Sequence, residues 1–263
     1  MHEITLLQGL SLAALVFFLG IDFWLEALFL FRPIIVCTLT GAILGDIQTG
    51  LITGGLTELA FAGLTPAGGV QPPNPIMAGL MTTVIAWSTG VDAKTAIGLG
   101  LPFSLLMQYV ILFFYSAFSL FMTKADKCAK EADTAAFSRL NWTTMLIVAS
   151  AYAVIAFLCT YLAQGAMQAL PAWLTQSFEV AGGILPAVGF GLLLRVMFKA
   201  QYIPYLIAGF LFVCYIQVSN LLPVAVLGAG FAVYEFFNAK SRQQAQPQPV
   251  ASKNEEEDYS NGI

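Results

Sequence analysis

Residues Gly41 to Gly79 read GAILGDIQTGLITGGLTELAFAGLTPAGGVQPPNPIMAG, and this stretch decides how the rest of the chain is interpreted. Glycines and prolines interrupt an otherwise apolar sequence that also carries polar side chains: Asp46, Gln48, Glu58, Gln71 and Asn74. Hydrocarbon tolerates irregular backbone only where it is packed in protein or lines a watery cavity. Membrane segments that combine Gly/Pro breaks with polar side chains are typical of transport sites. The stretch is therefore interpreted as the substrate-binding element of a membrane transporter.

The composition is that of a chain that lies mostly in a membrane. Of its 263 residues, 58% are hydrophobic and 10% are charged, and the mean hydropathy is +0.79. A soluble globular chain has about 25% charged residues. Because the shortage of charge extends over nearly the whole sequence, a soluble domain on one anchor is excluded. We expect an all-α polytopic integral membrane protein with roughly eight to ten membrane segments, including re-entrant and broken helices.

Charge and cysteine usage exclude several other classes of protein. The formal net charge is −4, and acidic residues gather near the end of the chain at 255–258. No basic face exists that would neutralise phosphates, so no nucleic-acid partner is expected. The four cysteines show no CxxC spacing and are interpreted as small apolar side chains. No cleavable signal is predicted, because the first apolar run lacks a basic segment before it.

The chain divides in sequence into four parts. Residues 1–123 form an N-terminal membrane part with the broken segments, and residues 124–140 form a hydrophilic loop. Residues 141–240 form a C-terminal membrane part, and residues 241–263 a disordered acidic tail. The lysines and arginine of the loop predict a cytoplasmic location for it. A second Gly–Pro break, AGGILPAVGFG, is expected within Phe178–Met197, and Pro102 is expected to kink a helix over Thr95–Met122.

Carboxylates at membrane depth are the first candidate functional groups. Such a group is costly unless it is paired or wet, and it marks a functional site by default. Glu58, between Gly55 and Gly63, is therefore a candidate for substrate binding or gating, with a structural salt bridge or helix cap as the alternative. Asp22 and Glu26 share one helix face. They lie either near a membrane surface or with one of them facing the cavity or an interface.

Three side-chain amides are the second group of candidates. Gln71 and Asn74 lie in GGVQPPNP, where the prolines forbid a regular helix. Their donors and acceptors suit a neutral polyhydroxyl ligand, and the alternative is a solvent-facing loop. Gln108 lies inside a predicted membrane helix, where it either contacts substrate or holds two helices together. Glu58, Asn74, Gln71 and Gln108 are thus the predicted substrate-binding residues.

The sequence contains none of the common catalytic motifs. It has no GxxxxGK[ST], no HExxH and no nucleophile elbow, so ATP hydrolysis and metalloprotease chemistry are not expected. The only histidine is His2, which leaves no buried residue suited to carry phosphate as a phosphohistidine. We predict no catalytic residue, no metal and no cofactor. Phosphate that energises transport would have to be carried by another polypeptide.

Several separated motifs resemble one family. RPIIVCTLTGAILGDIQTGLITGGLTELAFAG, GGVQPPNP and AGGILPAVGFGLLL are similar to the IIC subunits of mannose-family sugar phosphotransferase systems. Within the family, the resemblance is greatest to members that import N-acetylgalactosamine or galactosamine, and it covers essentially the whole chain. The GGLTE and PPNP motifs map onto Glu58 and Asn74. Mannose-specific members tend to have Asp at Asn74 and Lys at Gln48, so these departures are compatible with another sugar.

The resemblance also implies partners and a location. These are a IID membrane subunit, soluble IIA and IIB phosphocarriers, the sugar and membrane lipid, in a bacterial cytoplasmic (inner) membrane. IIC–IID pairs would assemble into trimers, and the sugar would cross by an elevator-type movement and be phosphorylated by IIB. Two alternatives stay open. One is an ion-coupled secondary transporter with Glu58 as the ion site, and the other is a scaffold whose partner chain binds the sugar.

Overall fold

The computed structural model describes residues 2–64, 72–169, 171–216 and 222–245, and these form helices and connecting turns without a strand. The prediction of an all-α membrane protein is confirmed. The helices are α1 (Leu6–Leu25), α2 (Pro33–Leu44), α3 (Ile47–Phe61), α4 (Pro75–Thr89), α5 (Ala93–Ala117), α6 (Ser119–Lys130), α7 (Thr134–Ala169), α8 (Ala172–Met197), the 3-10 turn η1 (Ala200–Tyr202), α9 (Ile203–Tyr215) and α10 (Leu222–Ala245).

Four of the described helices are long and apolar enough to cross a membrane. They lie at Leu6–Leu25, Ala93–Ala117, Thr134–Leu162 and Trp173–Met197. Four more helical stretches are apolar but shorter, at Pro33–Leu44, Pro75–Thr89, Ala200–Tyr215 and Leu222–Asn238. A full crossing takes about 20 residues. The shorter helices therefore suit a protein in which several segments enter the hydrocarbon without crossing it as one straight helix.

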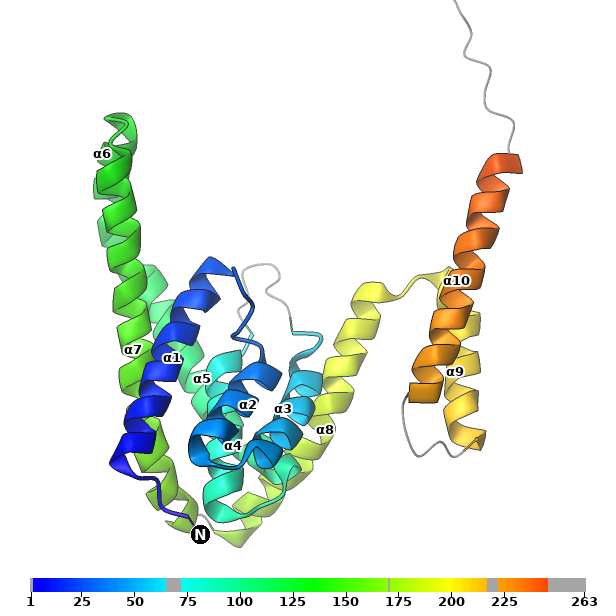
Figure 1. Ribbon diagram of the computed structural model, residues 1–263, viewed down its shortest axis with the longest axis horizontal. Helices are drawn as coiled ribbons and strands as arrows, with labels where there is room; N and C mark the ends of the chain where they lie inside the picture. Colours follow the sequence, from blue (N-terminus) through cyan, green and yellow to red (C-terminus); the bar gives the residue numbers. More distant parts are fainter. Residues whose placement is uncertain (1, 65–71, 170, 217–221, 246–263) are drawn as a thin grey trace, which may run out of the picture. The chain divides into compact units, whose positions relative to one another are not determined.

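The chain folds into two compact units, Met1–Met197 and Phe198 onward. In the first unit, α2 and α3 form a helical hairpin on α4, α1 packs along α7, and α5 lies between α4 and α8 (Figure 1). Because α7 and α8 pack with the N-terminal helices, they belong to the same compact unit. The division of the chain at residues 123 and 140 stays a prediction.

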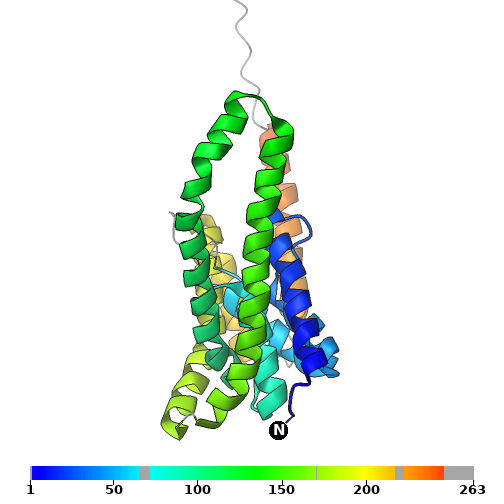
Figure 2. The ribbon, with the colours of Figure 1, turned by 90° about the vertical axis from the view of Figure 1, so that its left-hand side faces the viewer.

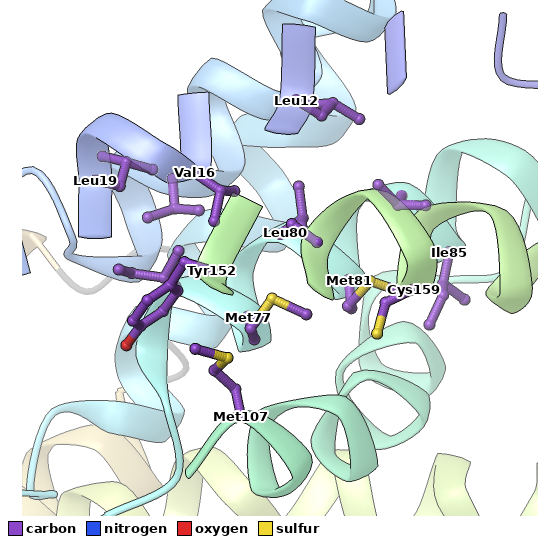
Figure 3. Close-up of a cluster of buried hydrophobic side chains, with 14 of the residues drawn as sticks. Leu12, Val16, Leu19, Met77, Leu80, Met81, Ile85, Met107, Tyr152 and Cys159 are labelled. Atoms are coloured by element: carbon purple, nitrogen blue, oxygen red, sulfur yellow. The ribbon is translucent and has the colours of Figure 1, made fainter. Parts of the chain in front are cut away.

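Helix α4 is the centre of the first unit and is buried along most of its length. Figure 3 shows Met77, Leu80, Met81 and Ile85 of α4 among side chains of α1, α5 and α7. A helix that is hydrophobic all round is stable only when other helices cover it. The start of α4, where the PPNP motif lies, is therefore held by the most deeply buried helix of the unit.

The central Gly/Pro stretch makes one tight turn and one longer break. At the first, Gly45 adopts a φ of +86°, which favours glycine. Asp46 then caps α3 by accepting hydrogen bonds from Thr49 N at 3.0 Å and Thr49 Oγ1 at 2.6 Å. The longer break separates α3, which ends at Phe61, from α4, which begins at Pro75. The predicted interruption of the helices before PPNP is confirmed.

The second expected break is not present, because α8 continues as one α-helix through Pro186. The glycines of this stretch serve close helix packing instead. A Cβ on Gly182 would overlap the carbonyl oxygen of Lys94 in α5, and a Cβ on Gly98 would overlap that of Phe178 in α8. Small residues let helix backbones approach in this way. α5 also continues through Pro102 without a break in the helix.

The hydrophilic segment is a helical hairpin rather than an open loop. Lys124 to Lys130 lie in α6, α7 begins at Thr134, and only the short turn between them is not helical. The hairpin projects beyond the end of α1 (Figures 1 and 2). Its tip exposes Lys124, Lys127 and Lys130.

In the second unit, α9 and α10 pack on each other. The Tyr205 hydroxyl donates a hydrogen bond to Glu235 Oε2 at 2.9 Å, and the Tyr205 ring contacts Phe231. α10 continues to Ala245 and so enters the stretch expected to be disordered, of which residues 246–263 lie outside the described part.

Candidate functional site

A cavity of about 230 Å³ lies in the first unit, where the end of α1, the start of α2, the end of α3, the start of α4 and the second half of α5 meet. Pockets for drug-sized ligands measure about 300–1,000 Å³, so this cavity suits a ligand about the size of one sugar ring. The wall is formed by aromatic rings, prolines, two amide side chains and two charged groups: Phe23, Trp24, Phe31, Phe61, Tyr115, Pro33, Pro72, Pro73, Pro75, Asn74, Gln108, Glu26 and Arg32.

Asn74 lies in the cavity wall and holds the break together. Its Oδ1 accepts a hydrogen bond from Met77 N at 3.0 Å and caps α4. Its Nδ2 donates to the hydroxyl of Tyr152 in α7. Its backbone N–H donates to Ser104 O at 3.3 Å, and its carbonyl oxygen accepts from Ser104 Oγ at 2.8 Å. Asn74 is 2% exposed, so this predicted site residue joins α4, α5 and α7 at the cavity.

Glu58 is held by an ion pair and a helix N-terminus. Arg32 Nη2 donates to Glu58 Oε1, and Ile34 N in the first turn of α2 donates to Oε2 at 3.3 Å. The positive end of the α2 dipole adds to this attraction. Arg32 lines the cavity, and Glu58 supports it from α3. Both features of the structural alternative, the salt bridge and the cap, are present.

The structure describes one of the two predicted glutamines. Gln108 is half-buried and lines the cavity from α5, beside Ile111. Gln71 lies outside the described residues. Of the four predicted residues, the structure thus brings Asn74 and Gln108 into one cavity wall and places Glu58 next to it through Arg32.

The turn after α1 forms another part of the wall. Asp22 is 6% exposed, and its carboxylate accepts hydrogen bonds from Leu28 N at 2.9 Å and Leu30 N at 2.6 Å. Glu26 and Phe29 have φ values of +46° and +56°, a left-handed conformation that surrounding contacts must hold in residues other than glycine. Asp22 supplies such contacts and Glu26 lines the cavity, so the two acidic residues have separate roles.

Sequence reasoning missed several residues that line the cavity or hold its wall in place. Arg32 was visible only as part of the Arg-Pro pair that begins α2, and its partner Glu58 is 26 residues away. Trp24 comes from α1 and Tyr115 from α5, and their rings pack edge to face with centroids 5.4 Å apart. Tyr152 is 78 residues from Asn74. The proline of the Arg-Pro pair was the one local signal, since proline is common in the first turn of a helix.

The wall combines flat apolar faces with groups that form hydrogen bonds. Such a lining, mostly apolar with a few placed polar groups, is typical of small-molecule sites. The amides offer both donors and acceptors, and the guanidinium offers donors only. Among the described residues, no group of three or more His, Cys, Asp and Glu side chains is arranged to hold a metal ion. The arrangement suits binding of a neutral polar molecule.

A family model matches most of the chain. The model described as the PTS system sorbose-specific IIC component matches residues 6–234. The chain is 97% identical to N-acetylgalactosamine permease IIC component 1 of Escherichia coli K12, over all of both chains. It is 28% identical to the sorbose-specific EIIC component of Klebsiella pneumoniae over 95% of each chain.

Solved structures give the same picture of the fold. One, described as "Structure of membrane protein", is 26% identical, covers 89% of this chain and 96% of its own, and superposes with a TM-score of 0.77. A chain of the mannose transporter ManYZ in complex with microcin E492 is 25% identical over the same shares, with a TM-score of 0.57. These similarities join the chain to multi-pass membrane proteins.

Proposed function

Because the chain belongs to the sorbose-specific IIC family within the mannose-type phosphotransferase systems, we propose that it is the subunit that carries an amino sugar across the membrane. The proposed sugar is N-acetylgalactosamine or galactosamine. The full-length relative at 97% identity supports this sugar class. The observation that carries the function is the cavity at the break between α3 and α4, with its aromatic and amide wall.

The sugar site in this proposal is that cavity. Asn74 and Gln108 contribute the amide groups, Glu58 acts at the edge of the wall, and Gln71 belongs to the same PPNP segment. Rings such as Trp24 and Tyr115 offer flat faces to the C–H side of a pyranose. The Gly/Pro break supplies the geometry, because the end of α3 and the start of α4 on its two sides both line the cavity.

Phosphorylation of the sugar is assigned to partner chains. A IID subunit would share the membrane complex, in trimers of IIC–IID pairs, and IIA and IIB would pass phosphate to the sugar. The likeness to a chain of ManYZ supports a membrane partner. This chain contributes no catalytic or phosphorylated residue in the proposal. The phosphorylated sugar is trapped because a dianion does not recross hydrocarbon readily.

Charge supports one orientation in a bacterial inner membrane. In the first unit, the hairpin tip and the ends of α1 and α8 lie toward one side, and the N-terminus lies toward the other (Figure 1). The basic residues near the first side are Lys124, Lys127 and Lys130 in α6, Arg139 near the start of α7 and Arg195 near the end of α8. On the other side, Lys94 lies in the first turn of α5, next to the end of α4. The backbone N–H of His2, near the N-terminus, donates a hydrogen bond to Ser88 O at that end of α4. The positive-inside rule puts the hairpin side in the cytoplasm, where IIB would reach a sugar moved by an elevator-type step.

The test is uptake into vesicles that contain the IIC–IID complex. We expect accumulation of sugar phosphate when phosphoenolpyruvate and the soluble carriers are present, and none without them. Accumulation of free sugar driven by a proton or sodium gradient alone would reject the phosphotransferase function and favour ion coupling. Binding of galactosamine, N-acetylgalactosamine, mannose and sorbose to the same complex identifies the sugar.

A second measurement tests where the sugar binds. Gln108→Ala and Tyr115→Ala should weaken sugar binding while the IIC–IID complex still assembles. Unchanged binding in both variants would mean that the partner chain holds the site and that this chain is a scaffold.

A further inference from the structure

Arg32 and Glu58 form an ion pair of which only Arg32 lines the cavity. The Arg32 side chain is 45% exposed and lines the cavity, whereas the Glu58 side chain is 20% exposed and lies behind it on α3. Both carboxylate oxygens of Glu58 already accept a hydrogen bond, one from Arg32 and one from Ile34 N. The carboxylate is therefore directed at protein donors, and Arg32 is the member of the pair that lines the cavity.

Arg32 retains hydrogen-bonding capacity that Glu58 does not use. A guanidinium has five N–H donors in a fixed planar fork. Glu58 accepts from the Nη2 nitrogen only. The remaining donors can bind oxygen acceptors, and a sugar offers hydroxyl oxygens and, when acetylated, an amide carbonyl oxygen.

The pair also sets the charge of this part of the wall. A bare guanidinium at membrane depth would be costly and would add to the positive end of α2. Glu58 neutralises both, so this part of the wall has strong donors with little net charge, and Glu26 adds a carboxylate elsewhere in the wall. Such a group suits a neutral sugar and does not repel a protonated amino sugar strongly.

We propose that Arg32 binds the sugar directly and determines which sugars are accepted, and that Glu58 is a positioning residue that holds the guanidinium and balances its charge. This inference rests on the proposed function, because it takes the cavity as the sugar site. It assigns a role to Arg32 that the sequence did not indicate. It also moves Glu58 from direct recognition to a role through Arg32.

The test is a charge cycle measured as equilibrium binding to the purified IIC–IID complex. The probes are galactosamine, kept protonated by the buffer pH, and neutral N-acetylgalactosamine. Arg32→Gln removes charge-assisted hydrogen bonds and should weaken binding of the neutral sugar about 10- to 100-fold. It also leaves the Glu58 carboxylate unbalanced, so preference should shift toward the cationic sugar. Glu58→Gln leaves the guanidinium unbalanced and should shift preference toward the neutral sugar.

Opposite shifts in preference, each on the order of tenfold, are the expected result. Arg32→Gln/Glu58→Gln together should restore the wild-type preference at lower affinity for both sugars. A merely structural ion pair would weaken both sugars alike in every variant, and that outcome would overturn the proposal. The matched control is Glu131→Gln, which removes the exposed Lys127–Glu131 pair on the hairpin and should change neither affinity nor preference.

The same series separates failure of this inference from failure of the cavity assignment. If Gln108→Ala weakens sugar binding but Arg32→Gln does not, the Arg32 assignment is wrong and the site stands. If neither variant changes binding, the cavity is not the sugar site and both proposals fall. Complex assembly by size-exclusion chromatography shows for each variant that the protein is folded.

Discussion

The hydrogen bond between Asn74 and Tyr152 provides the sharpest test of how the cavity wall is built. Tyr152 is fully buried, and its hydroxyl accepts from the Asn74 amide across α4 and α7. Tyr152→Phe keeps the ring and removes the acceptor, which leaves a buried N–H without a partner. Such an orphaned group costs about 1–3 kcal/mol of unfolding free energy. The ring packing against Gly20 is unchanged, so the loss reports the hydroxyl alone.

Asn74→Ala removes more than Tyr152→Phe does. It takes away the cap of α4, worth about 0.5–2 kcal/mol, and it leaves the Tyr152 hydroxyl without its partner at a further cost of about 1–3 kcal/mol. The double variant lacks both partners, so no polar group of this pair remains unsatisfied. We expect its destabilisation to be smaller than the sum of the single variants by about 1–3 kcal/mol.

The assay is denaturant titration of the IIC–IID complex in mixed micelles, with all four members of the cycle. Tyr161→Phe is the matched control on the same helix. Its hydroxyl donates to Thr5 O at 3.2 Å near the exposed start of α1, and its loss should cost less than about 0.5 kcal/mol. Additive effects in the cycle would refute the reasoning, because they would show that the two side chains do not interact.

Four further predictions follow from other parts of the structure. Gly182→Ala should destabilise the complex by about 1–3 kcal/mol in the same titration, because its Cβ would overlap the Lys94 carbonyl; Gly183→Ala, whose Cβ meets open space, should be neutral or slightly stabilising, and equal effects would contradict this. Asp22→Ala should lower the unfolding free energy by about 1.5–3 kcal/mol for each backbone N–H that loses its charged acceptor, and it should weaken sugar binding. Asp22→Asn keeps one acceptor oxygen and should lower the unfolding free energy by about half as much. Unchanged stability in Asp22→Ala would refute the role of the carboxylate in the turn. The hydrogen bonds from Thr49 lower the pKa of Asp46 below its ordinary 3.8, so the stability it contributes is present above that value and is lost as pH falls through the lowered pKa; in thermal melts the advantage of wild type over Asp46→Asn should therefore shrink on acidification, and a constant difference would contradict the assignment. Glu3 and Lys127 are both exposed, and each can be replaced in turn by the single cysteine of a variant. An impermeant maleimide added outside cells should label the Glu3→Cys variant and not the Lys127→Cys variant. Labelling of Lys127→Cys would contradict the proposed orientation.

Apolar patterning predicted most of the helices, since membrane-spanning length and composition leave few alternatives. It did not predict that α8 passes through Pro186. Gly182, Pro186 and Gly189 resemble a break in sequence, but the structure has one continuous helix there, and its glycines pack closely on α5 and on the end of α3. Tertiary contacts overrode the local signal, and those contacts are not visible in one sequence.

Sequence reasoning named Asn74 and Gln108 of the candidate site but not Arg32 and the aromatic residues around them. The PPNP motif gave Asn74, and an Asn directly before a Pro that begins a helix is also the sequence pattern of an N-cap. Its role as a cap was therefore readable from the sequence. Its partners Ser104 and Tyr152, and the pairing of Glu58 with Arg32, depend on how distant helices meet. Periodicity and composition carry no information about such pairings.

The anchoring of Asn74 has a consequence for how a sugar would travel. Five hydrogen bonds tie this one residue to its own helix and to two others, and α4 behind it is enclosed on nearly every side. A wall fastened in this manner resists bending at the mouth of the cavity. In the proposed function, sugar passage would then involve movement of the enclosing helices together with the bound sugar, rather than bending of the cavity wall.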